Sequence, residues 1–112
     1  MQTQQVLAAL GALAQEMRLA VFRLLVQAGP AGLAASRIAQ ELDVPPSSLS
    51  FHLKELTNAG LIAPRQSGRF VIYAASFNTM NGLIAFLTEN CCGGNPCRPV
   101  SVACASPESS PP

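Results

Sequence analysis

The sequence predicts one mainly α-helical domain with a small β-hairpin, and three observations support that prediction. Hydrophobic residues form 49% of the 112 residues, which is enough for the core of a single domain of ordinary size. Apolar residues recur at helical spacing through most of residues 1–90. Two short predicted helices with a tight turn between them are followed directly by a predicted hairpin. This order of elements is that of a winged helix-turn-helix.

The first two helices are predicted from apolar periodicity and from residues that begin or end helices. Thr3 can cap a helix that carries apolar residues on one side as far as Ala14. A second helix is predicted over residues 16–28, where apolar side chains nearly encircle the axis, so we expect it to be the buried central helix. Gly29 and Pro30 end this helix.

The helix-turn-helix itself is predicted next. A short extended link over residues 31–34 leads to a third helix over residues 35–42. After a tight turn, a fourth helix begins at Pro46, because proline fits the first helical position. It runs to about Ala59 and ends at Gly60, since glycine adopts the left-handed conformation that stops a helix.

A hairpin and a last helix complete the predicted domain. Strands are expected over residues 61–65 and 69–74, with a glycine-containing turn between them. A last helix, capped by Ser76 or Asn78, keeps apolar residues at helical spacing to about residue 90. We predict a homodimer through the first and last helices, because one copy cannot fully cover their apolar stripes.

The composition changes at about Asn90. Glycine, proline and serine predominate after it, and such a stretch cannot hold a long helix. We therefore assign residues 1–90 to a winged helix-turn-helix domain for DNA binding and dimerisation. Residues 91–112 are assigned to a cysteine-containing loop and a flexible tail.

Charge and hydropathy limit the classes of partner. The net charge is only +1, so binding to nucleic acid would depend on a local patch that is repeated in a dimer. No apolar run approaches the ~20 residues that span a bilayer. The first five residues also lack the positive charge that begins a signal peptide. We therefore expect a cytoplasmic protein without a membrane partner.

The fourth predicted helix has one apolar face and one polar face. At about 100° per residue, Leu49, Leu53 and Leu56 share the inward face. Small hydroxyl side chains near the start of the helix suit base edges and phosphates, helped by the unpaired amides and the helix dipole there. The predicted DNA-binding residues of this helix are Ser47, Ser48, Ser50, Phe51, His52 and Lys54.

Two of these residues have alternative interpretations. Phe51 is an aromatic residue on the polar face and can touch a thymine methyl group, but it can equally pack against the wing or a partner helix. His52 lies at the boundary between the two faces. A half-buried side chain bonded to the backbone is as good an interpretation of His52 as a DNA contact.

The predicted hairpin adds two arginines to this surface. Arg65 and Arg69 flank its turn, where a wing would meet phosphates or the minor groove. Residues 45–73 hold three basic residues against one acidic residue, so the local charge supports the patch weakly. The alternative is that both arginines are ordinary solvated surface.

Two stretches of the sequence resemble a known family of regulators. Residues 47–56 (SSLSFHLKEL), followed by AGLI at residues 59–62, resemble the recognition helix of ArsR-type metalloregulatory repressors. Residues 17–19 and 22–25 resemble the opening of the second helix of the same family, and the resemblance covers about residues 5–90. It implies a cytoplasmic homodimer that represses its operator until a soft metal or metalloid binds. The resemblance does not fix the inducer, because effector sites differ among members.

The two metal sites familiar in that family are absent from this sequence. One lies in the third helix and uses a Cys-x-Cys box, but residues 36–42 contain no cysteine. The other lies on the last helix and uses histidine and carboxylate ligands, but that helix offers only Glu89. Sensing of zinc, nickel or cobalt therefore loses most of its support.

All four cysteines lie near the end of the chain. Cys91, Cys92 and Cys97 fall within seven residues and are joined by glycines, so their thiols can converge on one soft ion. Trivalent arsenic and antimony favour three thiolates, whereas zinc prefers four ligands. The stretch also resembles a subset of arsenic-responsive repressors with a vicinal cysteine pair after the last helix and a third cysteine beyond. That resemblance implies that residues 91–112 contain a metalloid-binding loop with Cys91, Cys92 and Cys97 as ligands, and it leaves Cys104 outside the site.

Other interpretations of these cysteines stay open. Cys104 can complete a structural zinc site, the thiols can be incidental, and cadmium, lead, mercury or methylated arsenite also suit soft thiolates. An enzyme with an activated thiolate is disfavoured, because the cysteines follow a helix C-terminus, whose dipole opposes thiolate formation. The sequence therefore predicts a repressor of operator DNA, not an enzyme. Its expected inducer is arsenite or trivalent antimony, and no organic cofactor is expected.

Overall fold

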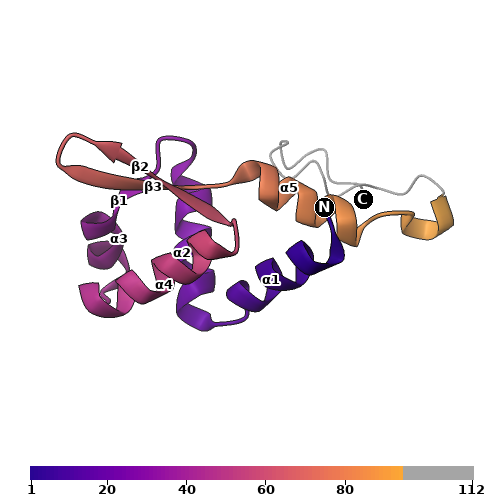
Figure 1. Ribbon diagram of the computed structural model, residues 1–112, viewed down its shortest axis with the longest axis horizontal. Coiled ribbons are helices and arrows are strands. Elements are labelled where there is room, and N and C mark those ends of the chain that lie inside the picture. Colours follow the sequence, from indigo (N-terminus) through magenta and orange to yellow (C-terminus); the bar gives the residue numbers. More distant parts are fainter. Residues whose placement is uncertain (95–112) are drawn as a thin grey trace, which may run out of the picture.

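The computed structural model describes residues 1–94 and has the predicted mainly α-helical architecture (Figure 1). In chain order the elements are α1 (Thr3–Leu13), α2 (Glu16–Ala28), β1 (Leu33–Ala34), α3 (Ala35–Leu42), α4 (Pro46–Asn58), β2 (Ile62–Ser67), β3 (Phe70–Ala75), α5 (Phe77–Leu87) and a 3-10 turn (Cys91–Gly94). The helix-turn-helix consists of α3 and α4, and the wing consists of β2 and β3. The predicted winged helix-turn-helix is thereby confirmed.

The predicted extended link before α3 is a strand of the wing sheet. β3 is the central strand, and β1 and β2 pair with it in antiparallel fashion on either side. β1 places Leu33 opposite Tyr73 and Ala34 opposite Ile72. Gly32 precedes it with φ at 69°, and a Cβ at this position would overlap the carbonyl oxygen of Tyr73. Only glycine therefore lets the loop before β1 approach β3 this closely.

The core lies between α2, α4 and the base of the sheet. Val21 and Leu25 of α2 have no exposed surface, but Leu19 is 43% exposed, so this helix is central on one side and faces solvent on the other. Leu49, Leu53 and Leu56 of α4 are 2%, 3% and 0% exposed, so the predicted inward face of this helix is confirmed. Burial of each such side chain is worth about 1.5–3 kcal/mol, and these leucines therefore fix the rotation of α4 about its axis.

The predicted N-cap of α1 was wrong, whereas the predicted N-cap of α5 is confirmed. Thr3 lies inside α1, and the cap is formed instead by Gln2, whose backbone N–H donates to the Gln5 side-chain oxygen at 2.8 Å. At α5 the first of the two expected caps is used, because the Ser76 Oγ accepts from the backbone N–H of Thr79 at 3.2 Å. In both cases the cap satisfies an amide that the helix itself cannot pair.

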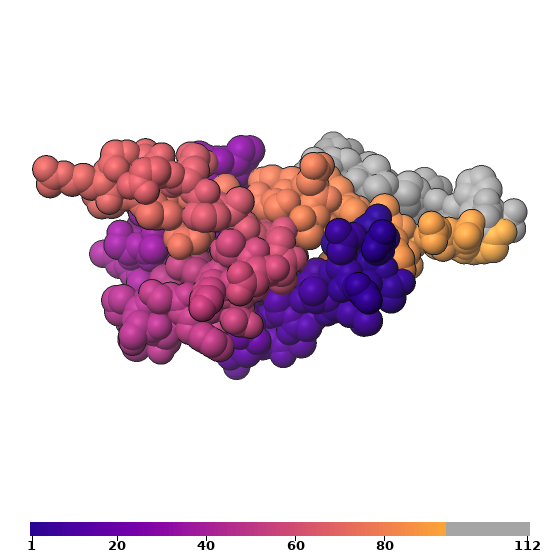
Figure 2. Space-filling view, viewed as in Figure 1, coloured from indigo at the N-terminus to yellow at the C-terminus, as the bar shows by residue number. Residues whose placement is uncertain are grey.

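The two ends of the molecule carry different parts of the chain. The start of α4 and the turn between β2 and β3 lie at one end, and residues 88–94, which follow α5, lie at the other (Figure 1). α1 and α5 contact each other near that second end. The wing projects from the body in the space-filling view (Figure 2). Within residues 1–94, no helix is long and apolar enough to cross a membrane.

Candidate nucleic-acid interface

α4 presents a polar surface on the side opposite its buried leucines. The side chains of this surface that the spacing predicted to be outward are all exposed: Ser47, Ser48, Ser50, Phe51 and Lys54. Lys54 forms no ion pair with any residue of the part of the chain that the structure describes. Its ammonium group is therefore available to a ligand of opposite charge.

The first turn of α4 has hydrogen-bond donors that the helix does not use. Its N-cap, Pro45, has no side-chain bond to offer, and the first helical hydrogen bond runs from the Leu49 N–H to the Pro45 carbonyl at 3.0 Å. The amides of Ser47 and Ser48 therefore lack a partner among residues 1–94. No acidic side chain lies in this turn. These amides and the helix dipole together favour an anion such as a phosphate.

Phe51 and His52 lie together on the same part of α4. Phe51 is 57% exposed, and its ring meets the His52 ring edge-on with centroids 5.6 Å apart. The ring of Phe51 is therefore not covered by the wing. His52 is half-buried, and its Nδ1 is buried without a hydrogen-bond partner. The expected alternative, a His52 ring bonded to the backbone, is therefore not found at this nitrogen.

The tip of the wing is exposed on both faces. All residues from 66 to 71 are exposed, and Arg69 forms no hydrogen bond or ion pair within the described part of the chain. Phe70, beside it, is 60% exposed. The sequence predicted Phe70 only as a strand residue, and its position next to the turn was the one available indication of a surface role. An exposed cation and an exposed aromatic ring therefore stand together at the wing tip.

Arg65 lies on β2, farther from the turn than Arg69, and differs from Arg69 in its hydrogen bonds. Its guanidinium donates to the carbonyl of Ala31 at 2.9 Å and to the carbonyl of Pro30 at 3.4 Å. Both arginines that the sequence placed on the DNA-binding wing are exposed, but Arg65 is hydrogen-bonded to a distant loop and Arg69 has no such bond within the described residues.

The cysteine pair follows α5 at the opposite end of the molecule. Cys91 and Cys92 are both exposed, and their Sγ atoms are 3.6 Å apart. Left-handed backbone at Asn90 (φ 56°) and Cys92 (φ 58°) turns the chain here. Cys97 and Cys104 lie outside the described residues. Within residues 1–94, no three histidine, cysteine or carboxylate side chains are grouped closely enough to hold a metal ion.

Comparisons with known proteins identify the class of this fold. A helix-turn-helix domain model matches residues 13–65, and no curated protein matches the chain. An ArsR-like transcriptional regulator from Rhodococcus sp. RHA1 is 28% identical, with 78% of each chain covered and a TM-score of 0.68. A possible transcriptional regulator for arsenical resistance is 29% identical over 70% of this chain and 79% of its own, with a TM-score of 0.61.

The fold of this chain is similar to that of these ArsR-like regulators, and residues 13–65 match a helix-turn-helix domain. A third structure, the homodimeric winged helix-turn-helix DNA-binding domain of Mb0332 from Mycobacterium bovis, is 22% identical and shares the fold. It covers 86% of this chain and 89% of its own, with a TM-score of 0.63. The similarity in fold thus extends beyond the helix-turn-helix to most of the chain.

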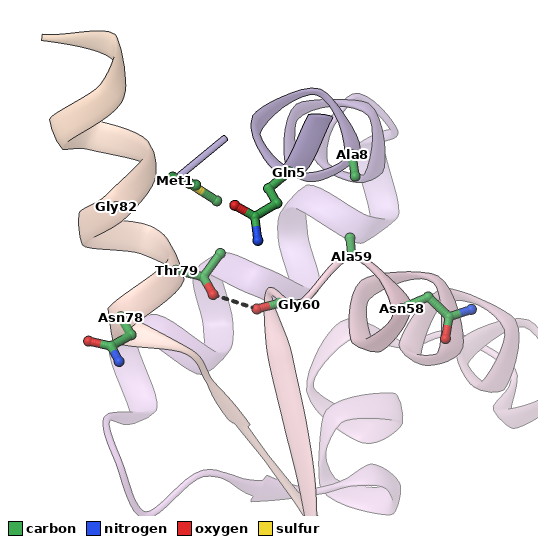
Figure 3. A pocket seen from close by; sticks show the side chains of 9 residues that line it. All are labelled: Met1, Gln5, Ala8, Asn58, Ala59, Gly60, Asn78, Thr79 and Gly82. Carbon is green, nitrogen blue, oxygen red and sulfur yellow. Dashed lines mark hydrogen bonds between the residues drawn. The ribbon is translucent and has the colours of Figure 1, made fainter. Parts of the chain in front are cut away.

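A cavity lies between α1, the end of α4 and the start of α5 (Figure 3). Its volume is about 520 Å³, and its lining, in which no side chain is charged, consists of Met1, Gln5, Ala8, Asn58, Ala59, Gly60, Asn78, Thr79 and Gly82. Beside it, the Thr79 Oγ1 donates to the Gly60 carbonyl at 2.7 Å. The Ser76 N–H donates to the Leu61 carbonyl at 2.8 Å. The start of α5 is therefore fastened to the turn that ends α4.

Sequence reasoning did not find this connection between the two helices. Ser76 was expected only as a helix cap, and nothing in the local sequence relates Thr79 to a carbonyl 19 residues earlier. In the folded chain, these two residues join α5, the helix that precedes Cys91 and Cys92, to the end of α4, the helix that carries the candidate DNA-binding surface.

Proposed function

We propose that this protein is a dimeric repressor that releases operator DNA when trivalent arsenic or antimony binds thiolates beyond α5. The observation that carries the proposal is the placement of two different surfaces at opposite ends of one domain. One end has an exposed polar helix face and a wing tip, and the other has two thiols with Sγ atoms 3.6 Å apart. The first surface suits DNA, and the second suits a soft ion.

DNA is bound by the exposed face of α4 and by the wing tip. The amides and hydroxyls of Ser47 and Ser48 at the helix start meet a backbone phosphate, while Ser50 and Phe51 face base edges. Lys54 adds a cation farther along the same face. An exposed phenylalanine in the major groove is favoured where a thymine presents its methyl group.

His52 and Arg69 complete the proposed interface. The buried Nδ1 of His52 has no donor to accept from, so the tautomer with hydrogen on Nε2 avoids a buried N–H without a partner. This tautomer gives His52 a donor on its other ring nitrogen. Arg69 at the wing tip binds the phosphate backbone or the adjacent minor groove.

Dimerisation through α1 and α5 covers apolar side chains that one copy leaves exposed. Leu7 and Leu10 of α1 are 62% and 38% exposed, and Ile84 and Leu87 of α5 are 38% and 60% exposed. Two-fold pairing of these helices removes such side chains from water and leaves both wing tips at the outside. The two copies of α4 then lie about 34–36 Å apart, which is one turn of DNA.

The thiol pair supplies the first two ligands for the inducer. Cys91 and Cys92 already lie with their sulfur atoms adjacent, and Cys97 follows within five residues along the chain. A trivalent arsenic or antimony atom takes these three thiolates. The same sulfur atoms also suit other soft species, namely cadmium, lead, mercury and methylated arsenite. A structural zinc that also uses Cys104 is the competing candidate.

Binding at the thiols reaches DNA through α5. At the end of α5, the Cys91 N–H donates a hydrogen bond to the Thr88 carbonyl. At the start of α5, the Thr79 hydroxyl donates a hydrogen bond to the Gly60 carbonyl, at the end of α4. In this proposal, binding of the inducer at the end of α5 alters the position of α4 in the dimer. A 100-fold loss of operator affinity requires only about 2.7 kcal/mol of coupling.

The experiment that tests this function is a titration on the protein's own upstream DNA. Fluorescence anisotropy of the labelled DNA is followed while arsenite, antimonite, methylarsenite, cadmium and zinc are added separately under reducing conditions. Release by arsenite and antimonite at lower concentrations than by zinc supports the proposal. Zinc that co-purifies with the protein and causes no release supports the structural zinc site instead. Failure to bind any fragment of the upstream DNA contradicts the proposed repressor.

A further inference from the structure

Arg65 connects the outer strand of the wing to the body of the domain. β2 is an edge strand of the sheet, and Arg65 pairs in register with Ile72 of β3. Its guanidinium reaches the carbonyls of Pro30 and Ala31, which lie in the loop before β1, the opposite edge strand. The side chain therefore joins the two edges of the three-stranded sheet across its central strand.

The loop that receives Arg65 has a fixed shape. The Gly32 N–H donates to the Gly29 carbonyl at 3.0 Å and closes a turn around Pro30 and Ala31. Gly32 then lies so close to Tyr73 that a Cβ would overlap its carbonyl oxygen. The two acceptor carbonyls are thus held in place on both sides, and hydrogen bonds from a charged guanidinium to them are stronger than those from a neutral donor.

The wing beyond Arg65 has little other support. Residues 66–71 are exposed, and the side-chain hydrogen bond in that stretch, from the Gln66 Nε2 to the Gly68 carbonyl, stays within the turn. A two-stranded hairpin without a packed face is marginally stable in water. The direction in which the tip projects therefore depends on what holds the strands at the level of Arg65.

We infer that Arg65 is a positioning residue, which holds the wing so that Arg69 at the tip reaches DNA. This inference rests on the proposed DNA binding and changes the role that the sequence suggested for Arg65 as a DNA contact. Arg69, which has no partner within the described residues, is the arginine that binds phosphate. The two arginines thus have different roles: Arg65 fixes the direction of the wing, and Arg69 contacts DNA.

The first test needs no DNA and compares hydrogen exchange in Arg65→Ala, Arg65→Lys and Arg69→Ala with the parent protein. We expect the amides of residues 66–71 to exchange about tenfold faster in Arg65→Ala, because the wing opens more often. Exchange in Arg69→Ala should match the parent. Arg65→Lys should be intermediate, since an ammonium group can reach one carbonyl but lacks the planar fork. Unchanged exchange in Arg65→Ala overturns the inference, even if the protein binds no DNA at all.

The second test is a double-mutant cycle on operator affinity and its salt dependence. In a dimer, Arg69→Ala removes two phosphate contacts and should lower the slope of log affinity against log salt by about 1.8. If Arg65 acts through Arg69, adding Arg65→Ala to Arg69→Ala should change affinity less than twofold and leave the slope unchanged. Additive losses, with a further fall in slope of about 1.8, would mean that Arg65 binds phosphate itself and would overturn the inference.

Discussion

The two ends of the domain are built in different ways. At the end that we propose binds DNA, α4 is backed by leucines that are at most 3% exposed, so its outward residues are held in fixed positions. At the thiol end, Leu87 is 60% exposed and residues 87–93 are all exposed. Segments with few buried contacts change conformation at low cost, whereas a packed helix moves as a unit. The contrast agrees with the proposed function, in which an inducer binds at the exposed end and changes the position of the packed helix α4.

The largest expected effect tests the rigid end. Leu56→Ala removes a side chain with no exposed surface behind the DNA-binding face and should lower the free energy of unfolding by about 2–5 kcal/mol. Phe51→Ala on the same helix is the control, because this ring is 57% exposed and should change stability by about 0.5 kcal/mol or less. Urea unfolding followed by circular dichroism measures both. Equal losses would mean that the two faces of α4 have been assigned wrongly.

The connection between the two ends is tested by removing one hydroxyl. Thr79→Val abolishes the hydrogen bond to the Gly60 carbonyl while keeping the shape of the side chain. Operator binding without arsenite should persist, but arsenite-induced release should fall by about tenfold, which is about 1.4 kcal/mol of lost coupling.

Thr88→Val is the matched control for this substitution. The Thr88 hydroxyl donates to the Ile84 carbonyl of its own helix and makes no bond to α4. It should therefore leave release close to that of the parent. If Thr79→Val and Thr88→Val respond alike to arsenite in anisotropy titrations, the coupling runs by another route.

The smallest expected effect concerns base recognition at the rigid end. Ser50→Ala removes one exposed hydroxyl and should change the preference among operator variants by about fivefold, roughly 1 kcal/mol. Ser36→Ala, an exposed serine on α3, should leave the preference unchanged. Competition between labelled operator variants measures this ratio. An unchanged ratio for Ser50→Ala would exclude its hydroxyl from base recognition.

The rigid end was largely predictable from local sequence. The spacing of the α4 leucines determined which residues face outward, and Pro46 and Gly60 mark the limits of this helix within two residues. These features depend on interactions within one or two turns of helix. For the same reason, the exposure of Ser47, Ser50 and Lys54 followed directly from the pattern.

Features that depend on long-range contacts were not predictable. The carbonyls that bind Arg65 lie 34 and 35 residues earlier in the chain, so no local pattern shows that the two arginines of the wing differ. β1 has only two residues, and its pairing with β3 requires Gly32 to lie against Tyr73. The arrangement of the three predicted thiol ligands also stays a prediction, because Cys97 lies outside the described residues.

The central claim is that the thiol end controls DNA binding without taking part in it. The measurement that tests it most directly is anisotropy of labelled operator with the Cys91→Ser, Cys92→Ser double variant, with and without arsenite. The account predicts operator affinity within about twofold of the parent, because the thiols lie at the end opposite the DNA-binding surface, and no release by arsenite. Arsenite-induced release that persists in the double variant would contradict it.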